Sequence, residues 1–252
     1  MNRTAYLARI GIADAGCAID EKTLNLLQRQ HLLNVPFENL DIGWHRPIIL
    51  DTERLYKKVV EGGRGGFCYE LNGLFNELLV DLGFHTRLVS GRVYGGEEGY
   101  GPEFDHMAIV VTLGDAEFLA DVGFGDFCYE PLKIDPSEEQ VDREGVFIVR
   151  ATEHGSFEVE KKSGDTWRPE CLFGRSSHKL QEFTAMCEFH QTSPESHFTK
   201  GRICSLMTEN GRKTLSEKTF GVTTNGVKIE TAVESEDQFN RILKQKFLIE
   251  KV

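Results

Sequence analysis

The first third of the chain has the hydrophobic period of α-helices. Apolar residues recur every three or four positions after Asp20, after Asp51 and between Cys68 and Leu82. The two aspartates can each accept a hydrogen bond from the free backbone N–H groups of a helix's first turn. Glycine follows the second and third segments, where helices commonly end. The pattern therefore predicts three helices, and the third, which has the most regular hydrophobic face, begins at or near Cys68.

After residue 85 the pattern changes to short runs of branched and aromatic residues. Clusters of Gly, Asp and Ser separate these runs, as is typical of antiparallel strands joined by turns. The predicted strands cover residues 87–94, 106–113, 117–122, 146–150, 156–161 and 166–172. Beyond them, we expect a helix near 178–189, an irregular stretch at 191–202, strands at 203–208 and 226–233, and a closing amphipathic helix.

These segments predict an α+β fold in three consecutive parts. Residues 1–85 are mainly helical, residues 86–190 are rich in strands, and residues 191–252 form a small α/β part. The chain shows no internal repeat and no low-complexity linker between these parts. With 252 residues it is long enough to bury a sizeable core.

Charge and hydropathy exclude several classes of partner. The sequence has 29 basic and 40 acidic residues, a formal net charge of −11. Nucleic-acid binding without sequence preference needs a basic surface, so we do not expect it here. No stretch approaches the ~20 apolar residues of a membrane span, and the first residues lack the apolar run of a secretory signal. We expect a cytoplasmic protein without a membrane partner, in which any anion site is local.

The six cysteines lie far apart and do not have the spacing of a disulfide framework. Most are expected to be small buried apolar residues. They stand at positions 17, 68, 128, 171, 187 and 204. Cys187 and His190 have helical spacing, but two ligands without further partners do not define a zinc site. We therefore predict no metal site.

Cys68 differs from the other cysteines in its setting. It follows Arg64-Gly65-Gly66-Phe67 and opens the strongest predicted helix. Glycines let the backbone turn tightly and approach a ligand closely. Free N–H groups at a helix start favour a thiolate, so we expect a lowered thiol pKa. A structural cysteine is the commoner role for such a residue, but this setting makes Cys68 a candidate nucleophile.

A histidine and a carboxylate in the strand-rich part could complete a catalytic set. His106 begins an apolar strand after the glycine-rich segment 95–102, and Asp121 lies in another apolar run. An isolated buried charge is very costly, so Asp121 needs a partner. The two strands can pair through a turn near Gly114 with both side chains on one face. Each residue alone is compatible with a structural role. With Cys68 they predict a nucleophile, a base and an orienting carboxylate.

The segments around these residues resemble those of the arylamine N-acetyltransferases. Residues 64–72 are similar to that family's active-cysteine segment, and residues 104–107 and 119–125 to its histidine and aspartate segments. Residues 31–40, 192–198 and 210–215 match further segments in the right order. The resemblance implies a helical bundle that carries Cys68, a central antiparallel β-barrel that carries His106 and Asp121, and an α/β lid around a cysteine-protease-like core.

The resemblance also implies a reaction. Acetyl-CoA acylates Cys68, coenzyme A leaves, and an arylamine or hydrazine then attacks the thioester. By similarity, the acceptor pocket is lined by Phe37, Val93, Phe124 and Phe198. Gly125 would let the pantetheine arm approach the backbone, and Arg64 and Glu38 would form a buried ion pair beneath the site. The residues that contact the CoA nucleotide are not assigned, because the segments that bind it differ among members of the family.

Three other functions are compatible with parts of this pattern. A cysteine hydrolase or transglutaminase-like enzyme uses the same triad with a different acceptor. An amide synthase that closes a macrocycle shares the motifs. A relative that only binds xenobiotics would keep the fold, but it would not need all three groups of the triad. The sequence leaves open the natural acceptor, the choice among acetyl, propionyl and malonyl donors, and the oligomeric state.

Overall fold

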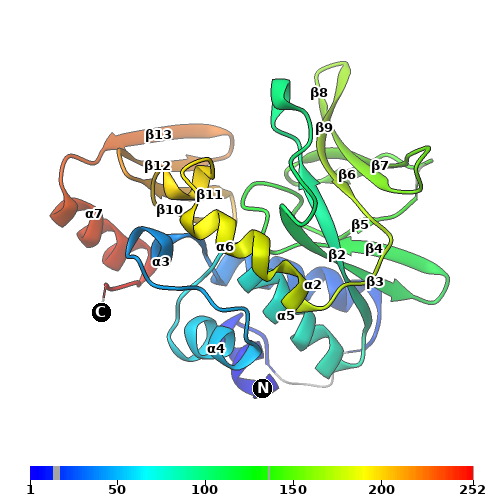
Figure 1. Cartoon of the computed structure of the whole chain (residues 1–252), viewed down its shortest axis with the longest axis horizontal. Helices are drawn as coiled ribbons and strands as arrows, with labels where there is room; N and C mark the ends of the chain where they lie inside the picture. The colour runs from blue at the N-terminus through cyan, green and yellow to red at the C-terminus, as the bar shows by residue number, and fades with distance from the viewer. Residues whose placement is uncertain (14–17, 136, 252) are drawn as a thin grey trace.

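The computed structural model describes residues 1–13, 18–135 and 137–251 (Figure 1). Five α-helices lie in the first third of this described chain: α1 (Arg3–Arg9), α2 (Glu21–Asn34), α3 (Leu40–Gly43), α4 (Thr52–Tyr56) and α5 (Cys68–Leu82). A π-helical turn, η1 (Lys57–Glu61), continues α4. Asp20 and Asp51 cap α2 and α4 through their side chains, and Gly83 ends α5 with a left-handed φ of 98°. The three predicted helices are therefore confirmed, and α1 and α3 are additional.

The strand-rich part forms an antiparallel sheet that curls into a nearly closed barrel, at the right of Figure 1. In spatial order its eight described strands are β5 (Leu132–Lys133), β4 (Ala116–Ala120), β3 (His106–Leu113), β2 (His85–Val93), β9 (Thr166–Phe173), β8 (Phe157–Ser163), β7 (Gly145–Ala151) and β6 (Gln140–Asp142). A short 3-10 turn, η2 (Gly96–Glu98), follows β2. The predicted α+β class with a central barrel is confirmed.

A second antiparallel sheet lies beside the barrel, at the upper left of Figure 1. Its order is β1 (Phe37–Glu38), β10 (Ile203–Thr208), β11 (Gly211–Ser216), β12 (Thr219–Thr224) and β13 (Val227–Ala232). The short strand β1 comes from the helical third, so Phe37 pairs with Ser205 from the other end of the chain. Helix α7 (Glu236–Ile242) and the turn η5 (Leu243–Phe247) pack against this sheet. The division at residues 85 and 190 stays a prediction.

Between β9 and the second sheet lie η3 (Leu180–Phe183), α6 (Thr184–Thr192) and η4 (His197–Thr199). The helix predicted at 178–189 is therefore confirmed, with a 3-10 first turn. Part of the stretch expected to be irregular is helical, because Ser196 caps η4 through its side chain. In the described part of the chain, no helix is both long and apolar enough to cross a membrane.

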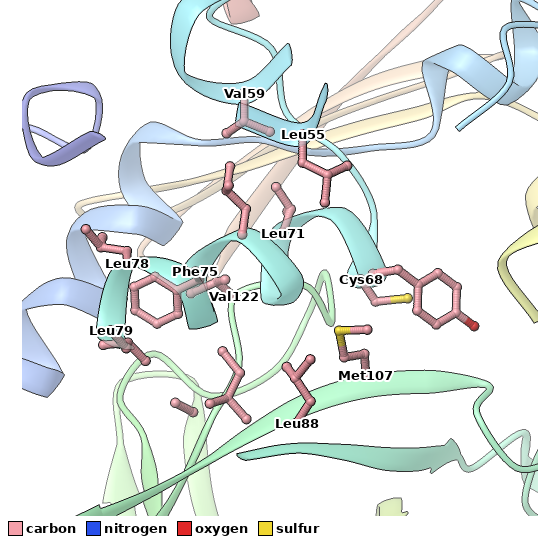
Figure 2. Packing of buried hydrophobic residues seen from close by; sticks show 14 of the residues in the cluster. Leu55, Val59, Cys68, Leu71, Phe75, Leu78, Leu79, Leu88, Met107 and Val122 are labelled. Carbon is pink, nitrogen blue, oxygen red and sulfur yellow. The ribbon is translucent and has the colours of Figure 1, made fainter. Parts of the chain in front are cut away.

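Helix α5 lies at the centre of the largest hydrophobic cluster. Figure 2 shows Leu71 and Phe75 of this helix between the helices and the barrel strands that carry Leu88 and Met107. Burying a side chain of this size contributes about 1.5–3 kcal/mol. The cluster therefore fixes α5 on the barrel, and Cys68 at its first turn is held beside the start of β3.

Candidate active site

The backbone before Cys68 passes unusually close to the Pro36–Glu38 segment. A Cβ atom on Gly65 would lie 1.8 Å from the carbonyl oxygen of Pro36, so only glycine fits there. Glu38 donates its backbone N–H to the Gly66 carbonyl at 2.8 Å, which ties β1 to this loop. These contacts bring the Phe37 ring to the site of Cys68. The close approach at Gly65 is to the backbone of Pro36, and the predicted approach to a ligand stays a prediction.

Helix α5 begins at Cys68. The Glu70 carboxylate accepts the backbone N–H of Phe67 at 3.2 Å, which satisfies one free donor of the first turn. On its other side Cys68 meets the segment that follows Asp121. A Cβ atom on Gly123 would lie 2.7 Å from the Cys68 Cα atom. This contact holds the helix start and the Asp121 segment in register.

His106 and Asp121 lie on neighbouring strands and face one another. Strands β3 and β4 pair antiparallel, with Ile109 opposite Ala120. His106 begins β3, Asp121 follows the last residue of β4, and the His106 Nε2 and Asp121 Oδ2 atoms are 2.5 Å apart. Both side chains are buried. The predicted pairing is therefore present. Because Nε2 is bound to the carboxylate, Nδ1 is the ring nitrogen that remains for another proton.

Two buried amides complete the environment of Asp121. Asn72 donates to Asp121 Oδ1 at 2.8 Å and to the Met107 carbonyl at 2.6 Å, and its oxygen accepts the N–H of Val122 at 2.8 Å. Gln28 accepts the N–H of Asp121 at 2.9 Å. A buried carboxylate needs a donor such as the Asn72 amide, because its desolvation is otherwise uncompensated. Sequence reasoning assigned no role to either amide. The signal was a polar residue on the apolar face of each helix.

The protonation of Cys68 differs from the expectation. Burial raises the pKa of its thiol well above the usual range, and the carboxylates of Asp121 and Asp105 act in the same direction. The N–H of Tyr69 at the helix start lowers this pKa, but by less. The prediction of a lowered thiol pKa is therefore wrong for the thiol in this setting. A neutral thiol needs a base at hand, and His106 lines the same cavity.

The other described cysteines, at positions 128, 171, 187 and 204, are buried free thiols. Burial also raises their pKa. They do not line the cavity that contains Cys68. Cys17 lies outside the described residues. Position on the cavity therefore distinguishes Cys68 from these four thiols.

A cavity of about 720 Å³ opens above Cys68. Its wall includes Cys68 and His106 and every residue that the resemblance placed in the binding site: Phe37, Val93, Phe124, Phe198 and Gly125. The Phe124 ring meets the His106 ring edge to face at 4.9 Å, and Phe198 lies 6.3 Å from Phe37 between ring centroids. Aromatic walls of this kind provide both contact area and orientation for a flat ligand.

Four basic side chains also line the cavity. They belong to Lys200, Arg202, Arg212 and Lys218. Arg212 donates to the Gly125 carbonyl, which joins the second sheet to the segment after Asp121. Arg202 is bound by two carboxylates, Glu217 at 2.7 Å and Glu236 at 2.6 Å. The cavity lining thus combines aromatic rings with these basic side chains, and three carboxylates, of Asp105, Asp126 and Glu217, also line it.

The predicted ion pair between Arg64 and Glu38 is part of a larger buried cluster. Arg64 Nη2 lies 2.7 Å from Glu38 and 3.1 Å from Asp41, and Lys58 Nζ lies 2.7 Å from both Asp41 and Glu70. The cluster thus has three carboxylates for two cations. Burial raises the pKa of Glu70 to about 7, despite the opposing charge of Lys58. The cluster lies beneath the helix start that carries the candidate nucleophile.

Comparison with known proteins agrees with this geometry. A family model described as N-acetyltransferase matches residues 20–251. The pineal gland arylamine N-acetyltransferase isozyme NAT-3 of Gallus gallus is 30% identical, over 99% of this chain and 94% of its own. An arylamine N-acetyltransferase from Bacillus cereus, described as having a unique Cys-His-Glu catalytic triad, superposes with a TM-score of 0.91 at 27% identity and covers both chains fully. The arylamine N-acetyltransferase from Salmonella typhimurium also superposes with a TM-score of 0.91 at 27% identity, over 98% of this chain and 91% of its own.

Proposed function

The chain belongs to the arylamine N-acetyltransferase family and is an acyltransferase with a small-molecule amine acceptor, and from this we propose a ping-pong mechanism through Cys68. The acyl donor is acetyl-CoA, and the acceptor is an arylamine or a hydrazine. The observation that carries the proposal is the 2.5 Å contact of His106 with Asp121 at the cavity that contains the Cys68 thiol. A cytoplasmic location stays a prediction from the sequence.

In the first half-reaction Cys68 becomes acetylated. His106 takes the thiol proton at Nδ1, and the sulfur attacks the acetyl carbonyl of the donor. The C–S bond to coenzyme A breaks, and the departing coenzyme A sulfur takes the proton from His106. Asp121 holds the imidazole through Nε2 and stabilises its positive charge while the proton resides there. Because burial favours the neutral thiol, the base must act at the moment of attack.

In the second half-reaction the amine replaces the enzyme sulfur. The acceptor nitrogen attacks the acetyl carbonyl, and His106 takes a proton from it. The bond between the carbonyl carbon and the Cys68 sulfur breaks, and the sulfur recovers the proton as a thiol. The aromatic wall of Phe37, Phe124 and Phe198 suits the flat ring of an arylamine. Gly125 adds no side chain at the cavity wall, which supports the passage of the donor's narrow arm.

The basic side chains that line the cavity support an anionic donor. An overall charge of −11 gives no general attraction for a CoA thioester, so a local cluster is needed. Lys200 and Lys218 line the cavity. We assign no contact of the nucleotide to a particular residue. Phosphate binding by these lysines would make the KM for acetyl-CoA rise with ionic strength.

The test is the rate of coenzyme A release from acetyl-CoA in the presence of an arylamine. Wild type should turn over, and Cys68→Ser should lose at least ~10³-fold, because serine is a far weaker nucleophile in this site. Cys171→Ala is the matched control, since this cysteine is buried in the barrel and does not line the cavity. Equal turnover by Cys68→Ser and wild type would contradict the proposal. Coenzyme A release that is independent of added amine would favour the hydrolase alternative.

A further inference from the structure

His190 of α6 is a buried histidine that the proposed mechanism does not use. Its ring stacks on Tyr69, the residue after Cys68, with centroids 6.0 Å apart and an interplanar angle of 27°. It meets Phe198 edge to face at 5.1 Å. Its Nε2 atom is fully buried and lies 3.3 Å from Oδ1 of Asp105, without the alignment of a hydrogen bond. His190 therefore contacts segments that carry the nucleophile, the base and one pocket wall.

The other ring nitrogen links His190 to the backbone of that wall. His190 Nδ1 lies 3.0 Å from Oγ of Ser196, which is itself buried. The same Oγ atom accepts the backbone N–H of Phe198 at 3.2 Å. Ser196 is thus the cap of η4 and the point where the imidazole holds the turn that presents Phe198. Rotation or loss of the imidazole would free this turn to move.

Asp105 extends the linkage to the opposite wall. Its Oδ2 accepts the backbone N–H of Val93 at 3.3 Å, and its carbonyl accepts the hydroxyl of Tyr69 at 3.1 Å. Burial alone would raise the pKa of this carboxyl, but the contact and charge of His190 bring the pKa below its ordinary value. Asp105 is therefore a charged group that needs His190 nearby. Through these contacts, Asp105 and His190 together link Val93 on one wall to Phe198 on the other.

We infer that His190 and Asp105 are positioning residues for the acceptor half-reaction, which hold Val93 and Phe198 in place so that an aromatic acceptor is oriented toward Cys68. This inference rests on the proposed function. The two walls contact the ring of an acceptor, whereas the acetyl group is small and its donor passes Gly125. Loss of His190 should therefore weaken the binding of ring-bearing acceptors and leave acetylation of Cys68 unchanged. A role limited to stability would affect both half-reactions alike.

The test compares phenylhydrazine with hydrazine as acceptors. Both attack through a terminal nitrogen, but only phenylhydrazine has a ring to meet Val93 and Phe198. In His190→Leu the KM for phenylhydrazine should rise roughly five- to tenfold, the scale of one lost buried hydrogen bond, while the KM for hydrazine stays within about twofold. His190→Asn can keep a hydrogen-bonding group near Ser196 and should recover part of the loss. If His190→Leu does not fold, Asp105→Asn should raise the KM for phenylhydrazine relative to the KM for hydrazine by the same factor.

His178→Leu is the matched control, because His178 also packs on an aromatic ring and also pairs with a carboxylate, Glu182, at 3.3 Å. It does not line the cavity. The ratio of the two KM values should stay at the wild-type value in this variant. An equal change for both acceptors, or no change for either, in His190→Leu and Asp105→Asn would overturn the inference. Wild-type protein that forms no acetylated Cys68 would instead overturn the proposed function.

Discussion

Replacing Asn72 by leucine should destabilise the protein and disable the site together. The side chain makes three buried hydrogen bonds, with the Met107 carbonyl, the Asp121 carboxylate and the Val122 N–H. Leucine has a similar volume and can make none of them. Each neutral bond contributes about 1 kcal/mol and the bond to a charged group about 1.5–3 kcal/mol, so the loss should be roughly 3.5–5 kcal/mol.

This loss is large against the 5–15 kcal/mol that typically separates folded from unfolded proteins. For a chain of this size about 1 kcal/mol shifts the melting temperature by roughly 2–4 °C, so Asn72→Leu should melt about 7–20 °C below wild type. Acetylation of Cys68 should slow as well, because Asp121 loses a donor that fixes its carboxylate. Thermal unfolding by circular dichroism and rapid-quench mass analysis measure the two effects.

Asn76→Leu is the control, because Asn76 lies one turn further along α5 and its buried side-chain oxygen has no hydrogen-bond partner among the described residues. The same change of residue there should not lower the melting temperature by more than about 3 °C, because leucine removes a buried oxygen that has no hydrogen-bond partner among the described residues. If Asn72→Leu and Asn76→Leu melt within about 3 °C of each other, the bonds of Asn72 do not hold the catalytic strands to the helix.

Three further outcomes follow from the geometry of the site. Asp121→Asn should slow acetylation of Cys68 by roughly 10³–10⁴-fold, because the amide no longer stabilises a protonated His106. Single-turnover kinetics measure this rate, and a loss well below this range would contradict the role of Asp121. His106→Asn should slow iodoacetamide labelling of Cys68 at pH 7 at least ~10-fold, because burial keeps the thiol neutral without its base; unchanged labelling would show that the thiolate forms independently. Glu70 ionises near pH 4.5 when unfolded and near 7 when folded, so its contribution to stability is complete below pH 4.5 and is lost as the pH rises to about 7. The melting temperature of Glu70→Gln should therefore change less than that of wild type between pH 5 and 7.5, and parallel curves would contradict the raised pKa.

The elements with strong local signals could be predicted from the sequence. The helix from Cys68 to Leu82 has a regular apolar face and a glycine at its end, and the structure gives the same bounds. The strands at 106–113 and 203–208 also agree, because apolar runs bounded by turn residues define them. The strands β11 and β12 were missed. Their side chains are mostly half-buried and polar, so they lack the hydrophobic signal of a core strand.

The partners of the site residues depend on contacts that no local pattern contains. Gln28 and Asp121 are 93 residues apart in the sequence, and a glutamine on the apolar face of a helix does not indicate which distant backbone N–H its side chain will accept. The thiol pKa was predicted from the helix start alone. The opposing effect, burial of Cys68 in the hydrophobic core together with the charges of Asp121 and Asp105, exists only in the folded chain. The identity of the candidate catalytic residues could therefore be predicted from the sequence, whereas the tertiary contacts that set their partners and pKa values could not.

The central claim is that the acetyl group passes through Cys68, and intact-mass analysis after brief mixing with acetyl-CoA tests it most directly. Without an acceptor, wild-type protein should gain the mass of one acetyl group, peptide mapping should locate it on Cys68, and added arylamine or hydrazine should remove it. Cys171→Ala should behave in the same way. No acetylated Cys68, or an adduct that persists when amine is added although free amine becomes acetylated, would contradict the account.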